Sequence, residues 1–293
     1  MAASRLIFGC GYLGKRVADR WAARGDQVTA VTRSPQTAES FRKGGLAPLV
    51  ADVTQPATLT GLPAVETLLF AVGYDRSGEA TISEVYADGF RSVLDALPGE
   101  PRRIVYISTT GVYGGAGGGD VDEATPPAPT RPGGVASLAA EQALRASRFA
   151  GCGVALRLAG IYGPGRVPLQ RQIAAGEPIA APAAGHVNLI HVDDAADVVV
   201  AAADAPGDLP PVLCVSDGAP PLRRDYYGEA ARLLGAPAPE FVTPAEGSPR
   251  AARAAADKRV RNDLMKQVLG VSLRYPNYGS GLAAILGKQG PEE

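Results

Sequence analysis

The chain has 293 residues, of which 46% are hydrophobic and 20% are charged, and its formal net charge is −1. This length and apolar fraction can bury the core of one large α/β domain, or of a nucleotide-binding domain with a smaller partner. The basic residues are scattered, which argues against nucleic acid or an anionic membrane surface as the main partner. The apolar runs are shorter than the ~18 residues that a membrane span requires.

Three cysteines, Cys10, Cys152 and Cys214, lie far apart and do not form the even, closely spaced set of a disulfide framework. The N-terminus enters an apolar stretch without the layout of a signal peptide. We therefore expect a cytoplasmic protein with reduced thiols.

Short β-branched runs alternate with amphipathic helical stretches through the first half of the chain. These runs are continuously apolar, as in strands that are covered on both faces. Later, residues 192–203 are expected to form a helix and residues 212–215 a strand. The pattern predicts an α/β fold, a Rossmann-type, doubly wound parallel sheet of about six or seven strands. The earlier strands are expected at 5–9, 27–32, 47–50, 67–72, 103–108 and 154–158.

The second half is less regular and is punctuated by proline and glycine. Residues 114–134 are too long for an ordinary connection and are typical of a lid or a binding loop. We expect a dinucleotide-binding domain over residues 1–165, to which 191–218 return. Residues 166–190 and 219–293 are expected to form a smaller, discontinuous C-terminal substrate domain.

The segment Gly9–Gly14 is a G-x-G-x-x-G that follows the first strand directly and opens the first helix. In this setting it is typical of a dinucleotide site, although a merely tight turn is the alternative. Gly9 permits the turn, Gly11 lets the backbone approach a pyrophosphate, and Gly14 allows close helix–strand packing. The helix N-terminus faces the anion, so Tyr12 and Leu13 are also expected at the cofactor.

The end of the second strand indicates which dinucleotide is bound. An NAD-specific site usually has an acid here for the ribose 2′-hydroxyl, whereas this strand ends with Arg33 and no acid. A guanidinium suits a 2′-phosphate, so NADP is favoured over NAD. A solvated surface arginine is the alternative. After the third strand, Asp52, followed by Val53, is expected either to meet the adenine amino group or to cap the next turn.

Three further segments are Ser108–Gly114, Arg157–Gly165 and Asn188–Asp194. Together with the glycine loop, and in this order, they resemble the extended short-chain dehydrogenase/reductases, also called the NAD-dependent epimerase/dehydratase family. The resemblance covers nearly the whole chain, but Phe8 stands where the family's G-x-x-G-x-x-G has its first glycine, which indicates an atypical branch. It implies that Thr109 is the family's catalytic Ser/Thr, which hydrogen-bonds a substrate oxygen. Alternatively, its hydroxyl only satisfies neighbouring backbone groups.

The family's acid–base pair, Tyr-x-x-x-Lys, is missing. Glu141 matches the acid that commonly follows the lysine by four positions, so Ser137 stands in the lysine's place and Gly133 in the tyrosine's. In the family the lysine holds the nicotinamide ribose and lowers the pKa of the tyrosine. Losing positioned acid–base help typically costs about 10²–10⁴-fold in rate. Either other residues replace the pair, or the protein binds NADP without the family's reaction.

Substitutes are scarce in the sequence. The resemblance places Ala71 and Gly73 beside the nicotinamide half. Tyr74, a candidate catalytic residue, follows them with Asp75 and Arg76, and all three can reach the open mouth of the site. Arg131 can supply a cation in place of the lysine, and Arg166 can hold an anionic substrate group. A solvated loop residue is the alternative for each. The two histidines are too few for a zinc site, and we expect no metal.

Two functions remain open. The first is an NADP-dependent oxidoreductase or epimerase that acts on a small polar substrate with a nonstandard active site. The second is a catalytically lapsed NADP-binding sensor or scaffold protein. The retained motifs favour the enzyme slightly. The expected partner is a small molecule and neither nucleic acid nor a membrane, with a homodimer left open.

Overall fold

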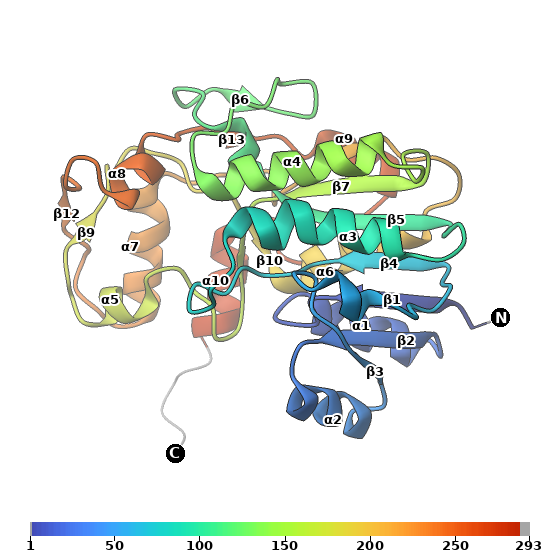
Figure 1. The fold of residues 1–293 in the computed structure, drawn as a ribbon. Helices are drawn as coiled ribbons and strands as arrows, with labels where there is room; N and C mark the ends of the chain where they lie inside the picture. Colours follow the sequence, from blue (N-terminus) through green and yellow to red (C-terminus); the bar gives the residue numbers. More distant parts are fainter. Residues whose placement is uncertain (1, 288–293) are drawn as a thin grey trace, which may run out of the picture. The chain divides into compact units, whose positions relative to one another are not determined.

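The computed structural model describes residues 2–287, and seven of its strands form one sheet (Figure 1). These strands are β1 (Ser4–Phe8), β2 (Gln27–Thr32), β3 (Ala47–Val50), β4 (Thr67–Phe70), β5 (Arg103–Thr109), β7 (Gly153–Leu158) and β11 (Val212–Val215). They follow the order β11-β7-β5-β4-β1-β2-β3, and the pairs β1–β2, β2–β3, β1–β4 and β4–β5 are parallel. This is the doubly wound order, so the predicted parallel sheet is confirmed.

Helices connect the strands at the places where the sequence shows helical periodicity. They are α1 (Gly14–Ala23), α2 (Pro35–Lys43), α3 (Gly89–Ala96), α4 (Pro132–Ala146) and α6 (Val192–Asp204), with the short helices η1 (Pro56–Leu59), η2 (Glu84–Asp88) and η3 (Thr110–Tyr113). The predicted helix at 192–203 therefore exists and extends one residue further. The predicted strand at 212–215 is β11.

One face of the sheet is covered by α3 and α4, which lie side by side (Figure 1). Phe70 of β4 and Tyr106 of β5 meet Phe90 of α3 there, with ring centroids 4.6 Å apart for Phe70–Phe90 and 4.8 Å apart for Phe90–Tyr106. All three rings are almost fully buried. Burial of such a side chain contributes roughly 1.5–3 kcal/mol, so this aromatic layer is a main source of stability for the sheet.

A network of charges fixes α1 and α6 beside the first strand. Arg20 of α1 lies 2.5 Å from the Asp197 carboxylate of α6. Arg5 of β1 is buried, and its guanidinium reaches Asp26 at 3.0 Å and Asp204 at 2.8 Å. A buried guanidinium is tolerated because two carboxylates compensate its charge.

The chain divides into two compact units. Unit 1 consists of Met1–Val112, Pro132–Arg157 and Ala196–Leu213, and unit 2 of Tyr113–Arg131, Leu158–Ala195 and Cys214–Glu293. The expected division into cofactor and substrate domains remains a prediction about function. None of the helices within residues 2–287 combines the length and the apolar character that crossing a membrane requires.

Unit 2 contains three small parallel strand pairs and five helices in its described part. The pairs are β6 (Asp120–Val121) with β13 (Arg259–Val260), β8 (Gly160–Tyr162) with β10 (Leu189–His191), and β9 (Ile179–Ala180) with β12 (Phe241–Val242). The helices are α5 (Gln170–Ala174), α7 (Arg223–Leu233), α8 (Pro249–Ala254), α9 (Asp263–Leu269) and α10 (Tyr278–Leu286). Close packing of α10 requires Gly281, because a Cβ there would lie 1.9 Å from the Tyr162 hydroxyl.

A buried carboxyl group follows β11. Asp217 is only 3% exposed, and its Oδ1 accepts a hydrogen bond from the Ala219 amide at 3.0 Å. Its Oδ2 and the Tyr162 hydroxyl are both buried without a hydrogen-bond partner among the described residues. Burial raises the pKa of Asp217 to about 7, and the charge of Asp194 acts in the same direction.

We predict that Asp217→Asn stabilises the protein above neutral pH. Between pH ~4 and 7 the folded protein holds a proton that an unfolded aspartate has lost, so this group's contribution to the free energy of unfolding falls as pH rises through that window. The variant should lack this slope and gain roughly 1–3 kcal/mol at pH 8. Thermal unfolding at pH 5 and pH 8 measures both the pH dependence of stability and the stability difference between the variant and the wild type. Asp95→Asn, at an exposed position of α3, is the control, and identical pH profiles for wild type and Asp217→Asn would contradict the prediction.

Candidate functional site

The predicted cofactor residues of unit 1 gather at one edge of the sheet. Gly9 follows β1, Arg33 follows β2, Asp52 follows β3, Ala71 follows β4, and Thr109 ends β5. Parallel strands end at a common edge, and ligands of such sheets bind outside the carboxyl ends. The order β5-β4-β1-β2-β3 puts the glycine loop between the other candidates, over a span of about 19 Å at normal strand spacing.

The three glycines of the loop are required for different reasons. Gly9 has a φ of +88°, and a Cβ there would lie 2.3 Å from the Ala71 carbonyl oxygen. A Cβ at Gly14 would lie 2.2 Å from the Gly9 carbonyl oxygen. A Cβ at Gly11 would meet nothing within 4 Å. The protein's own packing therefore requires the first and third glycines, and it leaves the space over the second one open.

The N-terminus of α1 opens beside this space. It has no side-chain cap hydrogen bond and no acidic residue in its first turn, so its positive end is suited to an anion. The Leu13 side chain is 6% exposed and belongs to the core, so only its backbone can meet a ligand. Burial raises the pKa of Cys10 to about 11, which keeps this loop thiol protonated and unreactive.

The structure places a carboxylate beside Arg33, and sequence spacing does not predict this contact. The guanidinium lies 3.4 Å from Asp75, and both side chains are about half exposed. Hydrogen bonds from Ser77, and then from Arg33, lower the pKa of Asp75. Such an exposed ion pair contributes little to stability, so an anionic ligand can displace Asp75. Sequence spacing gave no sign of this contact, because the two residues follow different strands.

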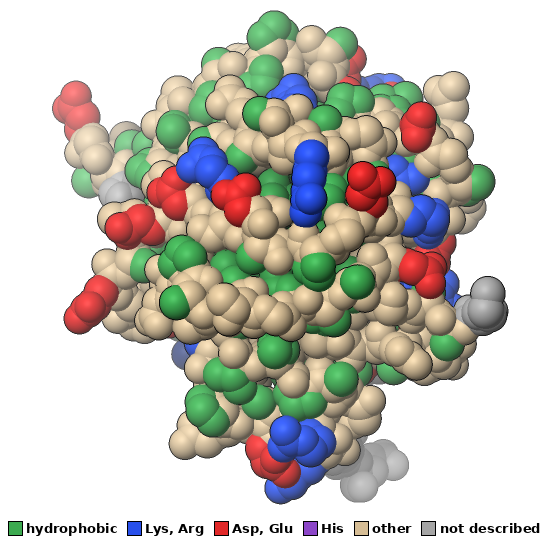
Figure 2. All heavy atoms as spheres, turned by 45° about the vertical axis from the view of Figure 1, so that its right-hand side comes forward, with side chains coloured by type: hydrophobic (Ala, Val, Ile, Leu, Met, Phe, Trp, Pro, Cys, Tyr) green, Lys and Arg blue, Asp and Glu red, His purple; other side chains and the backbone are tan. Residues whose placement is uncertain are grey.

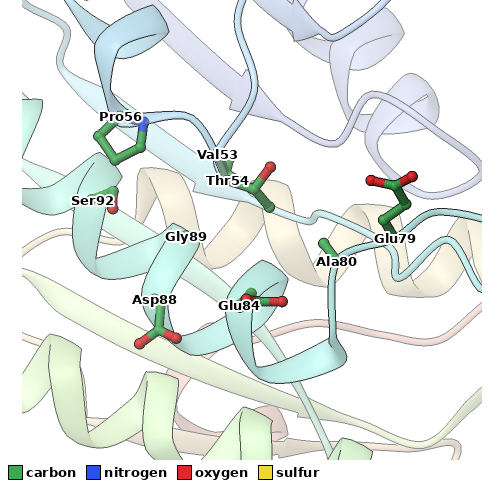
Figure 3. A pocket seen from close by; sticks show the side chains of 9 residues that line it. All are labelled: Val53, Thr54, Pro56, Glu79, Ala80, Glu84, Asp88, Gly89 and Ser92. Carbon is green, nitrogen blue, oxygen red and sulfur yellow. The ribbon is translucent and has the colours of Figure 1, made fainter.

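At the end of β3, the Asp52 Oδ1 accepts hydrogen bonds from the Thr54 amide at 2.9 Å and the Thr54 hydroxyl at 2.7 Å. The turn-capping alternative is therefore present in the structure. Val53 and Thr54 line a cavity of about 360 Å³ on the surface of unit 1 (Figure 3). Its volume lies at the small end of the range for ligand pockets. Its remaining lining residues are Pro56, Glu79, Ala80, Glu84, Asp88, Gly89 and Ser92.

The Thr109 hydroxyl accepts a hydrogen bond from the Gly111 amide at 3.0 Å. The backbone role is thus observed, while a hydroxyl keeps its own hydrogen for a second partner.

The Tyr74 amide donates to the Tyr86 hydroxyl at 3.2 Å, which fixes the segment that contains Ala71 and Gly73. Arg166 belongs to unit 2, where its backbone exchanges hydrogen bonds with Gly163.

Small residues fill the places of the missing Tyr–Lys pair. Ser137 of α4 is 2% exposed and lies near Tyr106. A Cβ at Gly133 would already lie 3.4 Å from the Ile82 side chain. Glu141 is 1% exposed and accepts hydrogen bonds from Ser108 at 2.6 Å and from Arg157 at 2.9 and 2.7 Å. The carboxylate that joins α4, β5 and β7 is therefore present without the acid–base pair.

Among residues 2–287, no group of three or more His, Cys, Asp or Glu side chains is arranged to hold a metal ion. His186 contacts Asp257 at 3.1 Å, and the His191 ring packs on Tyr275 with centroids 3.9 Å apart.

On the face of the molecule in Figure 2, acidic and basic side chains are interspersed, and no broad basic patch is visible there.

A family model described as the NAD dependent epimerase/dehydratase family matches residues 6–212. The chain belongs to this family. It is 33% identical over 244 residues to the protein YeeZ of Escherichia coli strain K12, covering 80% of this chain and 85% of that one. The family membership implied by the motifs is thereby confirmed.

Two solved structures are similar along almost the whole chain. A conserved protein of unknown function from Silicibacter pomeroyi is 32% identical, with a TM-score of 0.78 and coverage of 98% of this chain and 99% of that one. MoeE5, solved in complex with UDP-glucose and NAD, is 23% identical, with a TM-score of 0.75 and coverage of 98% of both chains. At that identity, the second likeness concerns the fold.

Proposed function

We propose that this chain is an NADP-dependent oxidoreductase or epimerase that acts on a small polar substrate with a nonstandard active site. The observation that carries the proposal is the open space over Gly11. No atom of residues 2–287 excludes a side chain from that position. Gly11 nevertheless lies between two glycines that packing requires, at a helix N-terminus without a side-chain cap. A pyrophosphate accounts for a glycine there.

The remaining cofactor contacts follow from the strand order. The adenosine half would extend toward β2 and β3, with its 2′-phosphate near Arg33 and the adenine near Asp52 and Val53. The nicotinamide half would extend toward β4 and β5, near Ala71, Gly73, Tyr74 and Thr109. MoeE5, a protein of the same fold, was solved in complex with NAD, which supports a dinucleotide as the cofactor. When bound, the nicotinamide supplies or accepts a hydride.

The first test concerns the glycine loop. Gly11→Val should abolish NADPH binding, because the branched side chain would occupy the space left for the pyrophosphate. The fold should survive, since no protein atom lies within 4 Å of the new Cβ. Titration calorimetry measures the affinity, and circular dichroism checks the fold. Gly151→Val is the matched control at an equally open glycine of unit 1. Unchanged NADPH binding in the Gly11 variant would refute this cofactor site.

The second test concerns the choice of dinucleotide. NADPH should bind more tightly than NADH, and Arg33→Ala should narrow the gap by roughly 1–3 kcal/mol, the loss of a charge-assisted hydrogen bond. Asp75→Asn should widen the gap, because it removes the carboxylate that competes with the 2′-phosphate for Arg33. Arg42→Ala, at an exposed arginine of α2, is the control. Equal affinities of the wild type for both dinucleotides would exclude a role of Arg33 in selecting NADP.

The third test concerns chemistry. If Thr109 directs a substrate oxygen, Thr109→Val should lower NADPH oxidation about 10²-fold while cofactor affinity stays nearly constant. Within residues 2–287 its Oγ1 accepts a single hydrogen bond, from the nearby Gly111 amide, so the variant should fold. Stopped-flow absorbance of NADPH follows the rate. Robust turnover that is indifferent to this change would place the chemistry elsewhere.

The alternative is a catalytically lapsed sensor or scaffold that still binds NADP. The observation that favours it is that Gly133 and the buried Ser137 stand in the places of the acid–base pair, so neither position supplies a proton donor of the family's kind. It predicts NADPH binding as above with no hydride transfer to any of a panel of small carbonyl compounds and nucleotide sugars. If one of these compounds oxidises NADPH in the presence of the wild type but not of Thr109→Val, the protein is an enzyme and the alternative is excluded.

A further inference from the structure

An almost fully buried lysine lies between α8 and β13 in unit 2. Lys258 is 5% exposed, and its ammonium donates a hydrogen bond to the Gly114 carbonyl oxygen at 2.6 Å. Burial, and then the nearby Arg131, lower the pKa of Lys258 to about 8. A buried cation whose bonded partner is a neutral carbonyl is costly, because one carbonyl replaces only part of its hydration.

Arg131 approaches the same place along the chain. A Cβ at Gly114 would lie 2.2 Å from the Ala128 carbonyl oxygen and 3.6 Å from the Thr130 side chain, so the residues that lead into Arg131 pack on the glycine that Lys258 contacts. Arg131 is partly buried, and its guanidinium makes no hydrogen bond or ion pair with any residue from 2 to 287. Burial, and then Arg253, lower its pKa.

The surrounding groups do not compensate these charges. Asp257, which precedes Lys258, accepts hydrogen bonds from the His186 amide at 2.8 Å and from the His186 ring at 3.1 Å. Arg223 is 8% exposed and donates to the carbonyl oxygens of Pro182 and Ala254. Besides burial, the charge of Arg131 lowers the pKa of Lys258 and that of Arg253 lowers the pKa of Arg131, whereas the charge of Asp257 opposes the shift of Lys258.

The backbone around Lys258 is held in place before any ligand binds. The Asn188 side chain donates to the Lys258 carbonyl at 2.9 Å and accepts from the Val260 amide at 2.7 Å. The Ala116 and Gly118 amides both donate to the Asp257 carbonyl, at 2.8 and 3.1 Å. A site on this backbone is preorganised, which reduces the entropy lost on binding.

We propose that Lys258 and Arg131 form an anion-binding site that takes a phosphate or carboxylate group of a small molecule. The assignment of this molecule as the substrate rests on the proposed function. The ammonium offers donors in addition to the one given to Gly114, and the guanidinium offers a planar fork that fits two oxygens of one oxyanion. Arg131 is predicted as a cation of the site from its place in the sequence. No sequence motif indicates Lys258, which is 127 positions away in the chain.

The binding test uses inorganic phosphate and succinate as probes, in titration calorimetry at pH 7.5 with saturating NADPH. We expect at least one probe to bind, and Arg131→Gln and Lys258→Met each to weaken it at least tenfold. Arg224→Gln, at an exposed cation on α7 in the same unit, is the control and should change nothing. Phosphate binding alone points to a phosphate ester, and succinate binding alone to a carboxylate. Binding of neither probe, or binding unaffected by either variant, would overturn the site.

A second measurement separates an anion site from a structural lysine. Without probe at pH 7.5, Lys258→Met should melt at or above the wild-type temperature, because removing an uncompensated buried ammonium relieves its desolvation. Between pH 8 and 10 the folded protein has lost a proton that the unfolded lysine keeps, so wild-type stability should rise relative to the variant. Probe affinity should fall over the same interval. A lysine that merely braces Gly114 would instead make the variant melt lower and would refute the proposal.

The pH window is chosen for the groups that face Lys258. These groups are Arg131, Arg223, Arg253, His186 and Asp257. Hydrogen bonds from His186 outweigh burial and lower the pKa of Asp257, so its carboxylate stays ionised throughout the window. Lys258→Met should leave NADPH affinity unchanged. If NADPH does not bind the wild type, the proposed function fails, while probe binding to the Gly11→Val variant still tests the anion site by itself.

Discussion

The contact between the Gly9 backbone and the Ala71 carbonyl is the constraint on which the cofactor edge depends. It brings the turn after β1 against the end of β4, and Gly14 then packs on Gly9 so that α1 starts directly over the strand. Any side chain at the first or third glycine would force these backbones apart. This fixes the α1 N-terminus over the point where the strand order reverses, between β1 and β4, and leaves the space at Gly11 open.

The sheet could be predicted from the sequence because its strands are continuously apolar runs with helical periodicity between them. Strand ends agree within two residues, and β4 stops at Phe70 rather than at residue 72 because the chain there already packs against the glycine loop. Unit 2 could not be predicted in this way, since six of its strands have two or three residues and leave no periodic signal. The Arg33–Asp75 and Lys258–Gly114 contacts join distant segments, and no local pattern encodes them.

The loss of the Tyr–Lys pair is a change in packing as much as in chemistry. Glu141 still joins Ser108 to Arg157, so α4 keeps its place on the sheet, while Ser137 is enclosed against Tyr106. A lysine at position 137 would bury an ammonium without a free carboxylate, because Arg157 already occupies Glu141. A Cβ at position 133 would make an ordinary contact with Ile82, at 3.4 Å, so the packing constraint lies at position 137. Reinstating the lysine would therefore require a new partner for its charge before any proton could be shuttled.

Buried arginines of this chain have two kinds of partner, carboxylates and backbone carbonyls. Arg5 and Arg157 are buried beside carboxylates, and Arg103 and Arg223, which lack such partners, each donate to two backbone carbonyls. Arg131 has neither kind of partner within residues 2–287, and the one bond of Lys258 goes to a single carbonyl. Natural proteins rarely leave a partly buried cation without acceptors, because its desolvation then opposes folding. An oxyanion supplies the missing acceptors and the missing charge together, which makes a ligand the simplest physical reason for this arrangement.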